Sequence, residues 1–188
     1  RGQIKRAVTH GEVIVSTGAI NSPQLLMLSG LGDADHLREL GLPVVADLPS
    51  VGQNLQDHLD VAVQHECKLP VSLYGVNKPL NAAAIGIEWF LFRTGPGATA
   101  HLEAGSFLRT ISSMESPDIQ HHFVPMFVIN HGMEWPDRHG YQVHISQMRP
   151  ESRGYLRLRS TDPREHPVID PNLLEAVEDR RCLRDGVK

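Results

Sequence analysis

Short apolar runs separated by glycine, proline and polar turn residues divide the chain into candidate helices and strands. The run at 12–16 lies between two glycines and predicts a buried strand. Ser22 then predicts the cap of a helix with Pro23 at its first position, and Gly30 predicts the end of that helix. The chain is therefore expected to begin with a strand, a turn and a helix.

The next fifty residues predict smaller elements. A short helix is expected over 34–40, with Asp33 or Asp35 as its cap. A short extended piece follows at 43–46, and 48–57 is rich in turn-forming residues and predicts a loop.

From Leu59 onward, extended patterns dominate. One helix is expected over 82–92, and a last helical stretch is expected to open at 170–172. The pattern as a whole predicts an α+β fold: part of an α/β domain, and a second region with a mostly antiparallel sheet flanked by helices. The strand candidates are 61–67, 105–109, 119–129, 141–148 and 155–159.

Composition narrows the class of protein. Hydrophobic residues make up 40% of the 188, which is enough for a buried core. The net charge of -4 gives no basic footprint, so nucleic acid is not an expected partner. Two distant cysteines, Cys67 and Cys182, favour a reducing compartment such as the cytoplasm. Association of the parent protein with a membrane is left open. The ends read as interrupted elements, so a fragment of a longer chain is expected.

The segment 18–32 carries the clearest motif. Physically, a glycine turn lets a ligand approach the backbone, and the helix that follows presents free N–H groups. The segment resembles the second signature of the glucose–methanol–choline (GMC) oxidoreductase family. The matching positions are Gly18, Ala19, Ser22, Pro23, Leu25, Leu26, Ser29, Gly30, Leu31 and Gly32.

Other segments extend the resemblance from about residue 8 to the end. Residues 51–58 resemble the family's Gly-x-Asn-Leu-x-Asp-His segment. Residues 65–74, 101–107 and 152–158 resemble the choline-oxidising branch in particular.

The resemblance implies an FAD-dependent enzyme in which the flavin takes a hydride from a primary alcohol, such as choline, and later passes electrons to an acceptor. The family's catalytic histidine and its Gly-x-Gly-x-x-Gly flavin turn have no counterpart in these 188 residues. No catalytic residue is therefore assigned, and the segment alone is expected to be inactive and to lose FAD.

The resemblance also implies cofactor proximity for two groups of residues. The first group matches the part of the flavin domain beside the cofactor, and the second matches the junction with that domain. An alternative for the second group is a loop held by Asx-type hydrogen bonds. The residues are Thr17, Gly18 and Ala19 in the first group, and Asn54, Asp57 and His58 in the second.

For substrate binding, the resemblance points to His122, with a structural strand histidine as the alternative. Strand alternation places His121 and His122 on opposite faces, so only one can reach a pocket. Glu103 is a candidate carboxylate for a quaternary ammonium group, or else forms a structural salt bridge. The aromatic candidates, for which a core role is the alternative, are Trp89, Phe107, Phe123, Phe127 and Trp135.

The expected organisation is a partial FAD-binding domain over 1–58, a substrate-binding domain over 59–169 and the start of a helix over 170–188. No metal site is expected, because no metal-binding motif occurs. A GMC alcohol oxidase, a flavin-containing lyase and a non-catalytic binding or structural module remain as alternatives. Apolar surface on 12–32 predicts association into oligomers.

Overall fold

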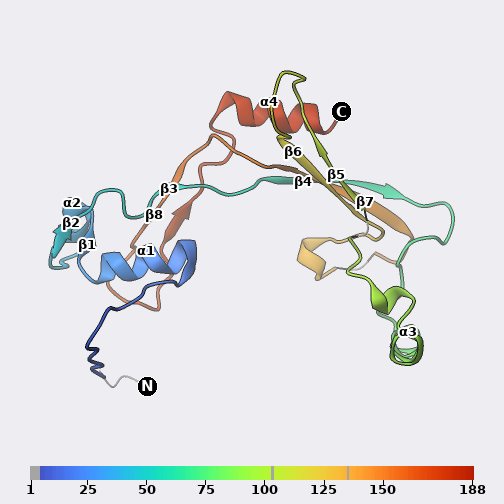
Figure 1. Cartoon of the computed structure of the whole chain (residues 1–188), viewed down its shortest axis with the longest axis horizontal. Helices are drawn as coiled ribbons and strands as arrows, with labels where there is room; N and C mark the ends of the chain where they lie inside the picture. Colours follow the sequence, from blue (N-terminus) through green and yellow to red (C-terminus); the bar gives the residue numbers. More distant parts are fainter. Residues whose placement is uncertain (1–4, 103, 135) are drawn as a thin grey trace. The chain divides into compact units, whose positions relative to one another are not determined.

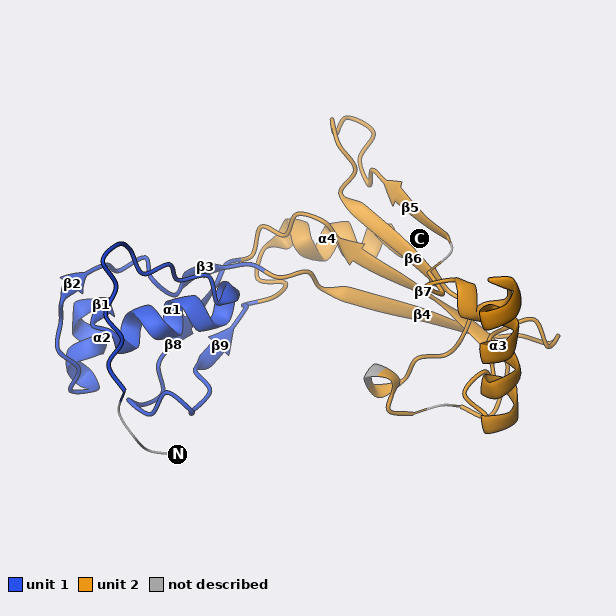
Figure 2. Cartoon of the chain, turned by 60° about the horizontal axis from the view of Figure 1, so that its bottom comes forward, with its two compact units in different colours: residues 1–56, 153–172 blue, residues 57–152, 173–188 orange. Residues whose placement is uncertain are grey.

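The computed structural model describes residues 5–102, 104–134 and 136–188, and these residues fold as two compact units (Figures 1 and 2). Unit 1 contains residues 1–56 and 153–172, and unit 2 contains residues 57–152 and 173–188. Each unit is built from two separate stretches of chain, and those of unit 1 are far apart in sequence.

Unit 1 combines two helices with short strands. Strand β1 lies between the two helices and pairs in parallel with β2, which follows α2, and a three-stranded antiparallel sheet has the order β3-β8-β9. Its elements are α1 (Gly18–Leu28), β1 (Leu31–Gly32), α2 (Ala34–Glu39), β2 (Ala46–Asp47), β3 (Gln53–Leu55), β8 (Gly154–Arg157) and β9 (Val168–Asp170).

The core of unit 1 forms where α1 and α2 meet strand β8. Met27 and Leu37 pack with Leu156 and Leu158, and all four are buried. A Cβ atom on Gly52 would lie 2.3 Å from the carbonyl oxygen of Leu156, so only glycine allows this close approach of the two backbones.

Unit 2 is organised around a four-stranded antiparallel sheet with the order β4-β7-β6-β5. The mostly antiparallel arrangement predicted for this region is confirmed. Its elements are β4 (Asp60–Glu66), α3 (Pro79–Phe92), η1 (Pro96–Ala98), β5 (Ala104–Leu108), β6 (Ile119–Val124), η2 (Asn130–Gly132), β7 (Gly140–Gln147) and α4 (Val177–Gly186).

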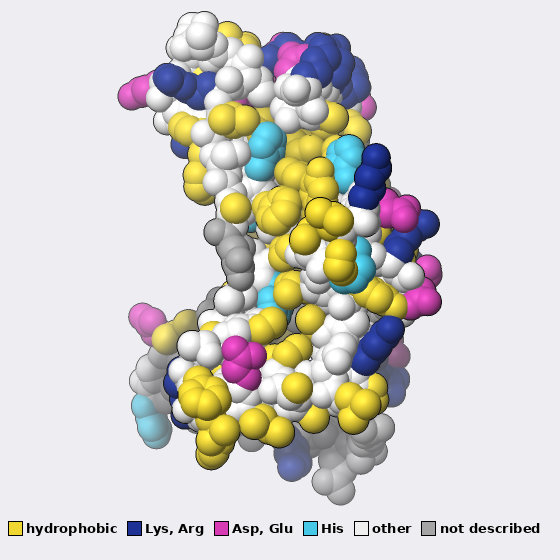
Figure 3. All heavy atoms as spheres, turned by 90° about the vertical axis from the view of Figure 1, so that its right-hand side faces the viewer, with side chains coloured by type: hydrophobic (Ala, Val, Ile, Leu, Met, Phe, Trp, Pro, Cys, Tyr) yellow, Lys and Arg dark blue, Asp and Glu magenta, His cyan; other side chains and the backbone are white. Residues whose placement is uncertain are grey.

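Helix α3 is apolar over most of its length and none of its residues is buried. Leu80 is 86% exposed and Phe90 is 70% exposed. In the view of Figure 3, a row of hydrophobic side chains runs along the lower edge of the molecule, where α3 lies. Within the described ranges, no helix is both long enough and apolar enough to span a membrane.

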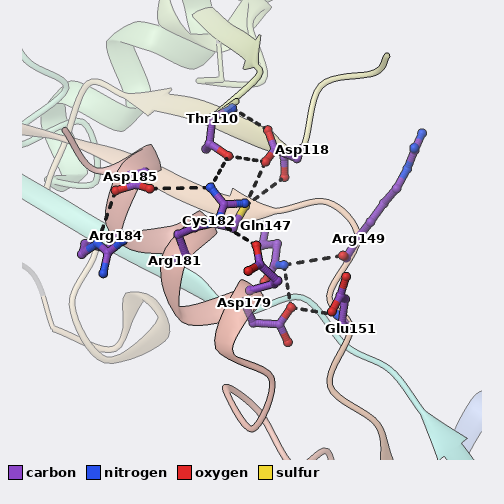
Figure 4. A network of polar contacts seen from close by, with 11 residues as sticks. Thr110, Asp118, Gln147, Arg149, Glu151, Asp179, Arg181, Cys182, Arg184 and Asp185 are labelled. Carbon is purple, nitrogen blue, oxygen red and sulfur yellow. Dashed lines mark hydrogen bonds and ion pairs between the residues drawn. The ribbon is translucent and has the colours of Figure 1, made fainter. Parts of the chain in front are cut away.

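Helix α4 covers one face of the sheet, which we call the α4 face. Cys182 and Leu183 pack against Ile119 of β6 and Ile145 of β7. Buried Asp179 anchors the start of α4 to the loop after β7 (Figure 4). The Asp179 carboxylate accepts hydrogen bonds from Gln147 Nε2 at 2.7 Å, from the backbone N–H groups of Glu151 and Ser152 at 2.8 and 2.9 Å, and from Ser152 Oγ at 2.5 Å.

The strand predicted over 12–16 is wrong. These residues form no strand, and Val13 and Ile14 are 80% and 82% exposed. A strand needs a neighbour for its N–H and C=O groups, and the described part of the chain offers none here.

Two helix boundaries also differ from their predictions. Helix α1 begins at Gly18 and includes Pro23, and the Ser22 hydroxyl accepts a hydrogen bond from the backbone N–H of Thr17 at 3.0 Å instead of starting the helix. The last helix begins at Val177, because residues 168–170 pair with β8 as strand β9.

Candidate functional site

The strand register of unit 2 gives the sheet two chemically different faces. The α4 face is mainly apolar, with Ile119, Val143 and Ile145 packed beneath the helix. The opposite face, which we call the polar sheet face, collects the alternate side chains of the same strands. Its polar members on β4, β6 and β7 are Asp60, Gln64, Glu66, Gln120, His122, Gln142, His144 and Ser146.

The two neighbouring histidines of β6 point to opposite faces, as the strand alternation predicts. His121 lies on the α4 face, where its Nε2 is 3.1 Å from the carbonyl oxygen of Gly186 and its Nδ1 is 3.1 Å from Ser106 Oγ. His122 lies on the polar sheet face directly opposite His144 in the register. The His122 side chain forms no hydrogen bond to any residue that the structure describes. Of the two, His122 is therefore the one available to a ligand.

The same register sorts the aromatic candidates. Phe107 is paired with Gln120 and shares the face of His122, with 57% of its surface exposed. Phe123 alternates to the α4 face, and Phe127 is buried. Phe107 is therefore the aromatic side chain best placed to contact the methyl groups of an ammonium ligand at this face. Glu103 and Trp135 lie outside the described residues.

In unit 1, Thr17, Gly18 and Ala19 form the amino-terminal end of α1. No side chain caps this end and its first turn contains no acidic residue, so its N–H groups and positive dipole end face outward. Gly18 has a φ of 91° and nothing within 4 Å of the position where a Cβ would stand. This end can therefore approach the polar part of a cofactor closely, which fits the supporting role in FAD binding that the resemblance implies.

Ala19 and Asn54 are far apart in sequence, but they line one open cavity of about 190 Å³. Its other walls come from Pro23, the loop around Gly52 and the side chain of Leu156. Asn54 has a φ of 59°, a left-handed conformation that asparagine tolerates better than most residues. Thr17 lines a different cavity of about 330 Å³ on α1.

Asp57 and His58 belong to unit 2, and both are tied by local bonds. The Asp57 carboxylate accepts a hydrogen bond from the backbone N–H of His58 at 2.8 Å. His58 Nε2 lies 3.1 Å from the carbonyl oxygen of Met148, next to the end of β7. Neither contact is an Asx-type turn, because Asp57 accepts from the next residue and His58 contacts a residue 90 positions away. Direct cofactor contact by the two residues remains a prediction.

Cys182 is a buried thiol on α4. Burial, followed by its contact with Asp118, raises the pKa of the Cys182 thiol to about 12. A nucleophile or metal ligand needs the thiolate, which this environment disfavours.

Asp60, Gln142 and His144 belong to no recognised motif in the sequence. Their only signal is the alternation of polar and apolar residues along β4 and β7, which predicts a two-faced sheet without showing which residues meet. The register brings Asp60 and His144 into hydrogen-bond contact although they are 84 positions apart.

Comparison with known proteins identifies relatives for both units. The family model described as GMC oxidoreductase matches residues 1–60 and residues 150–188. The chain is 55% identical over 187 residues to "Choline dehydrogenase, mitochondrial" of Mus musculus, which covers 97% of this chain and 31% of that protein. It is 49% identical over 177 residues to "Oxygen-dependent choline dehydrogenase" of Brucella ovis, which covers 92% of this chain and 32% of that protein.

Solved structures agree with this. A structure of formate oxidase from Aspergillus oryzae, concerned with FAD modification, superposes with a TM-score of 0.83 at 26% identity and covers 95% of this chain and 36% of that one. Pyridoxine 4-oxidase superposes with a TM-score of 0.70 at 25% identity, covering 90% of this chain and 30% of that one.

The chain spans about a third of the length of the curated relatives that it matches. Within that third, the matches cover the α1 motif, the polar sheet face and α4 together. The chain belongs to the GMC oxidoreductase family.

Proposed function

We propose that this chain supplies the substrate face and part of the flavin support of an FAD-dependent alcohol dehydrogenase that converts choline to betaine aldehyde. The observation that carries the proposal is the 55% identity, over 97% of the chain, to a protein named choline dehydrogenase. Bound FAD would supply the chemistry by accepting a hydride from the alcohol carbon.

On the polar sheet face, His122 would hydrogen-bond the substrate hydroxyl and hold the developing alkoxide. Phe107 would lie beside the ammonium group, and Glu103 would supply its counter-charge. In unit 1, the backbone N–H groups at Gly18 and Ala19, together with Asn54, would support the cofactor. Asp57 and His58 would lie at the boundary of the cofactor site.

An absorption spectrum tests cofactor and substrate together. The protein from the uninterrupted reading frame would be purified without oxygen, and its spectrum would be recorded before and after adding choline. A flavin spectrum that choline bleaches supports the proposal. Flavin that stays oxidised with choline and is bleached by another alcohol would overturn the substrate, and a colourless protein would overturn the cofactor.

The pair His122 and His121 gives a matched test of the sheet face. In the intact enzyme, we expect His122→Gln to lower kcat by about 100-fold, the effect typical of losing one donor to a developing oxyanion. His121→Gln should leave kcat within about threefold, because His121 faces α4 and such distant changes act mainly on stability. Equal losses of kcat in both variants would contradict the assignment.

We propose that the 188-residue chain alone neither binds flavin tightly nor oxidises an alcohol. No Gly-x-Gly-x-x-Gly turn occurs in it to hold the flavin pyrophosphate. The measurement is the flavin-to-protein ratio of the purified chain, and a stoichiometric yellow cofactor would contradict it.

An oxidase is the second candidate, because the Brucella relative is named oxygen-dependent and two structural relatives are named as oxidases. Comparing the rate of flavin reoxidation by oxygen with that by a redox dye separates the two functions. Faster turnover with the dye favours the dehydrogenase, and faster turnover with oxygen favours the oxidase.

A further inference from the structure

Four polar side chains on the polar sheet face form one continuous hydrogen-bonded row. Asp60 Oδ2 contacts His144 Nδ1, and His144 Nε2 lies 2.5 Å from Gln142 Nε2. Gln142 Oε1 in turn accepts hydrogen bonds from Gln64 Nε2 at 2.8 Å and from the backbone N–H of Val128 at 3.0 Å. The row joins β4, β7 and the loop after β6.

The donors and acceptors in this row allow only one arrangement of protons. The Val128 N–H can only donate, so the Gln142 atom facing it is the amide oxygen. The amide nitrogen of Gln142 then faces His144 Nε2, and it too can only donate. His144 Nε2 must therefore accept and carries no proton. The single proton of the ring lies on Nδ1 and is donated to Asp60.

Burial of Gln142 disfavours the alternative orientation of its amide group. Gln142 is fully buried at 0% exposure, so turning its amide over would leave the Val128 N–H facing an NH₂ group without water to compensate. A proton on His144 Nε2 would meet the same NH₂ group. Among the described residues, the other ionisable side chains on this face of β4, β6 and β7 are His122 and Glu66.

The row lies next to the residue that the proposed function uses. His122 and His144 are direct cross-strand partners, and such pairs have Cβ atoms about 5 Å apart. A charge on His144 would act strongly on His122 at that separation. Both ring nitrogens of His144 are occupied, whereas those of His122 have no partner among the described residues.

We propose that Gln142 and Asp60 are positioning residues that hold His144 neutral with its proton on Nδ1, so that His122 is the only histidine of this pair with a free ring nitrogen for an alcohol. The part concerning His122 rests on the proposed function. The part concerning His144 is a property of the fold and stands without flavin or substrate.

The test of the fold property is an NMR measurement of the imidazole nitrogens of the ¹⁵N-labelled chain near neutral pH. A His144→Gln variant identifies the resonances by their loss. We expect a proton-bearing Nδ1 and an unprotonated Nε2 for His144. An Nε2–H tautomer, or two protonated nitrogens, would overturn the proposal before any other variant is made.

The variant Gln142→Glu then replaces the NH₂ donor that faces His144 Nε2 with a hydrogen-bond acceptor. The new carboxylate can still accept from the Val128 N–H, and it can accept a hydrogen bond from a protonated His144 Nε2, whereas the amide NH₂ could only donate one. We expect the Nε2 resonance to move to the protonated position. Gln64→Ala is the matched control, because it removes a neighbour of Gln142 and keeps the Val128 contact that orients the amide, so the parent tautomer should persist. An unchanged His144 in Gln142→Glu, or a changed one in Gln64→Ala, would refute the mechanism.

In the intact enzyme, the same Gln142→Glu variant tests the effect on His122. The variant adds a proton on His144 and a carboxylate at position 142; the His144 ring lies directly opposite His122 and is nearer to it than position 142, which is diagonal. The nearer positive charge disfavours protonation of His122, so the acidic limb of kcat/KM against pH should move to lower pH. A merely structural disturbance would lower kcat/KM without moving the limb, and that outcome would sink the link to His122. If the enzyme binds no flavin or oxidises no alcohol, the proposed function fails while the NMR result still decides the tautomer.

Discussion

The two helices of unit 2 reverse the usual relation between composition and burial. Helix α3 has one charged residue, Glu88, among its fourteen, and none of its residues is buried. Helix α4 has ten residues, most of them charged, and it buries Asp179, Cys182 and Leu183. The six charged residues of α4 are Glu178, Asp179, Arg180, Arg181, Arg184 and Asp185. Apolar content alone therefore does not decide which helix is covered.

Spacing explains the burial of α4. Positions 179, 182, 183 and 186 recur at intervals of three and four, so they share one stripe of the helix that faces the sheet. A Cβ on Gly186 would lie 2.8 Å from Ile119, which shows how closely the helix approaches. Four of the other five charged residues of α4 form ion pairs, among them Arg181 and Asp185, which lie 3.6 Å apart (Figure 4).

Helix α3 has no such stripe, because its apolar residues surround it. Helices that are apolar on every side are normally enclosed by other protein or by lipid. The described part of the chain covers little of α3, and its side chains remain exposed (Figure 3). The comparison shows that α4 is buried because one stripe of its side chains fits the face of the sheet. Helix α3 has no such fit, so its apolar side chains stay exposed.

The largest effect on stability is expected at Asp179, which anchors the start of α4. Replacing Asp179 with alanine removes the buried acceptor of four hydrogen bonds, two of which come from the backbone N–H groups of Glu151 and Ser152. We expect Asp179→Ala to lower the free energy of unfolding by about 4 kcal/mol. Urea unfolding followed by circular dichroism measures the change. Asp185→Ala, on the same helix but in screened ion pairs, should cost less than about 1 kcal/mol, and equal costs would show that α4 is not anchored through Asp179.

The next effect tests the apolar half of the same stripe. Leu183 is 5% exposed and packs between β6 and β7, so Leu183→Ala leaves a cavity. We expect a loss of about 3 kcal/mol in the free energy of unfolding. Val187, 46% exposed one residue beyond α4, is the control, and Val187→Ala should change stability by less than about 0.5 kcal/mol. Similar losses in the two variants would contradict the assignment of the stripe.

Acid should weaken the anchor of α4 without any mutation. Burial alone would raise the pKa of Asp179, but hydrogen bonds from Ser152, Glu151 and Gln147 outweigh it and leave the pKa below its ordinary value of 3.8. A carboxyl with a lowered pKa stabilises the fold fully above its unfolded-state pKa, and this stabilisation is lost as the pH falls through the folded-state pKa. The stability difference between the parent and Asp179→Asn should therefore shrink below about pH 4. A difference that stays constant down to about pH 2 would argue against a charged Asp179.

Much of the secondary structure followed from local signals. The Asp33 cap is confirmed, since its carboxylate accepts a hydrogen bond from the His36 N–H at 2.9 Å, and the period-two alternation located β4, β6 and β7. The predictions failed where partners decide the outcome: 12–16 has strand composition but no strand beside it, and 168–170 pairs with β8.

The candidate site was predictable to a similar extent. Alternation alone separates His121 from His122, because it is a local rule. The pairing of Asp60 with His144 depends on the register between β4 and β7, which no local pattern specifies. The row that fixes the His144 tautomer therefore becomes visible only in the structure.

The smallest effect on stability, and the sharpest test of the comparison, lies on α3. Leu80 and Phe90 are exposed, so replacing both with serine should change the free energy of unfolding by less than about 0.5 kcal/mol per site. The same change should weaken self-association of the chain, because exposed apolar patches favour contact between molecules. Light scattering over a series of protein concentrations measures this. Val13→Ser with Ile14→Ser is the matched pair in unit 1, where the sequence also predicts association.

The two pairs of variants divide the outcomes. If only the Leu80→Ser and Phe90→Ser changes reduce the apparent mass, the exposed helix α3 drives association of the chain. The difference in burial between α3 and α4 then determines how the chain associates. If only the unit 1 pair reduces it, the surface over 12–32 dominates and α3 is a bystander. A parent chain that stays monomeric at high concentration would show that neither apolar surface is large enough to hold two copies together, because association must first offset the loss of translational and rotational freedom.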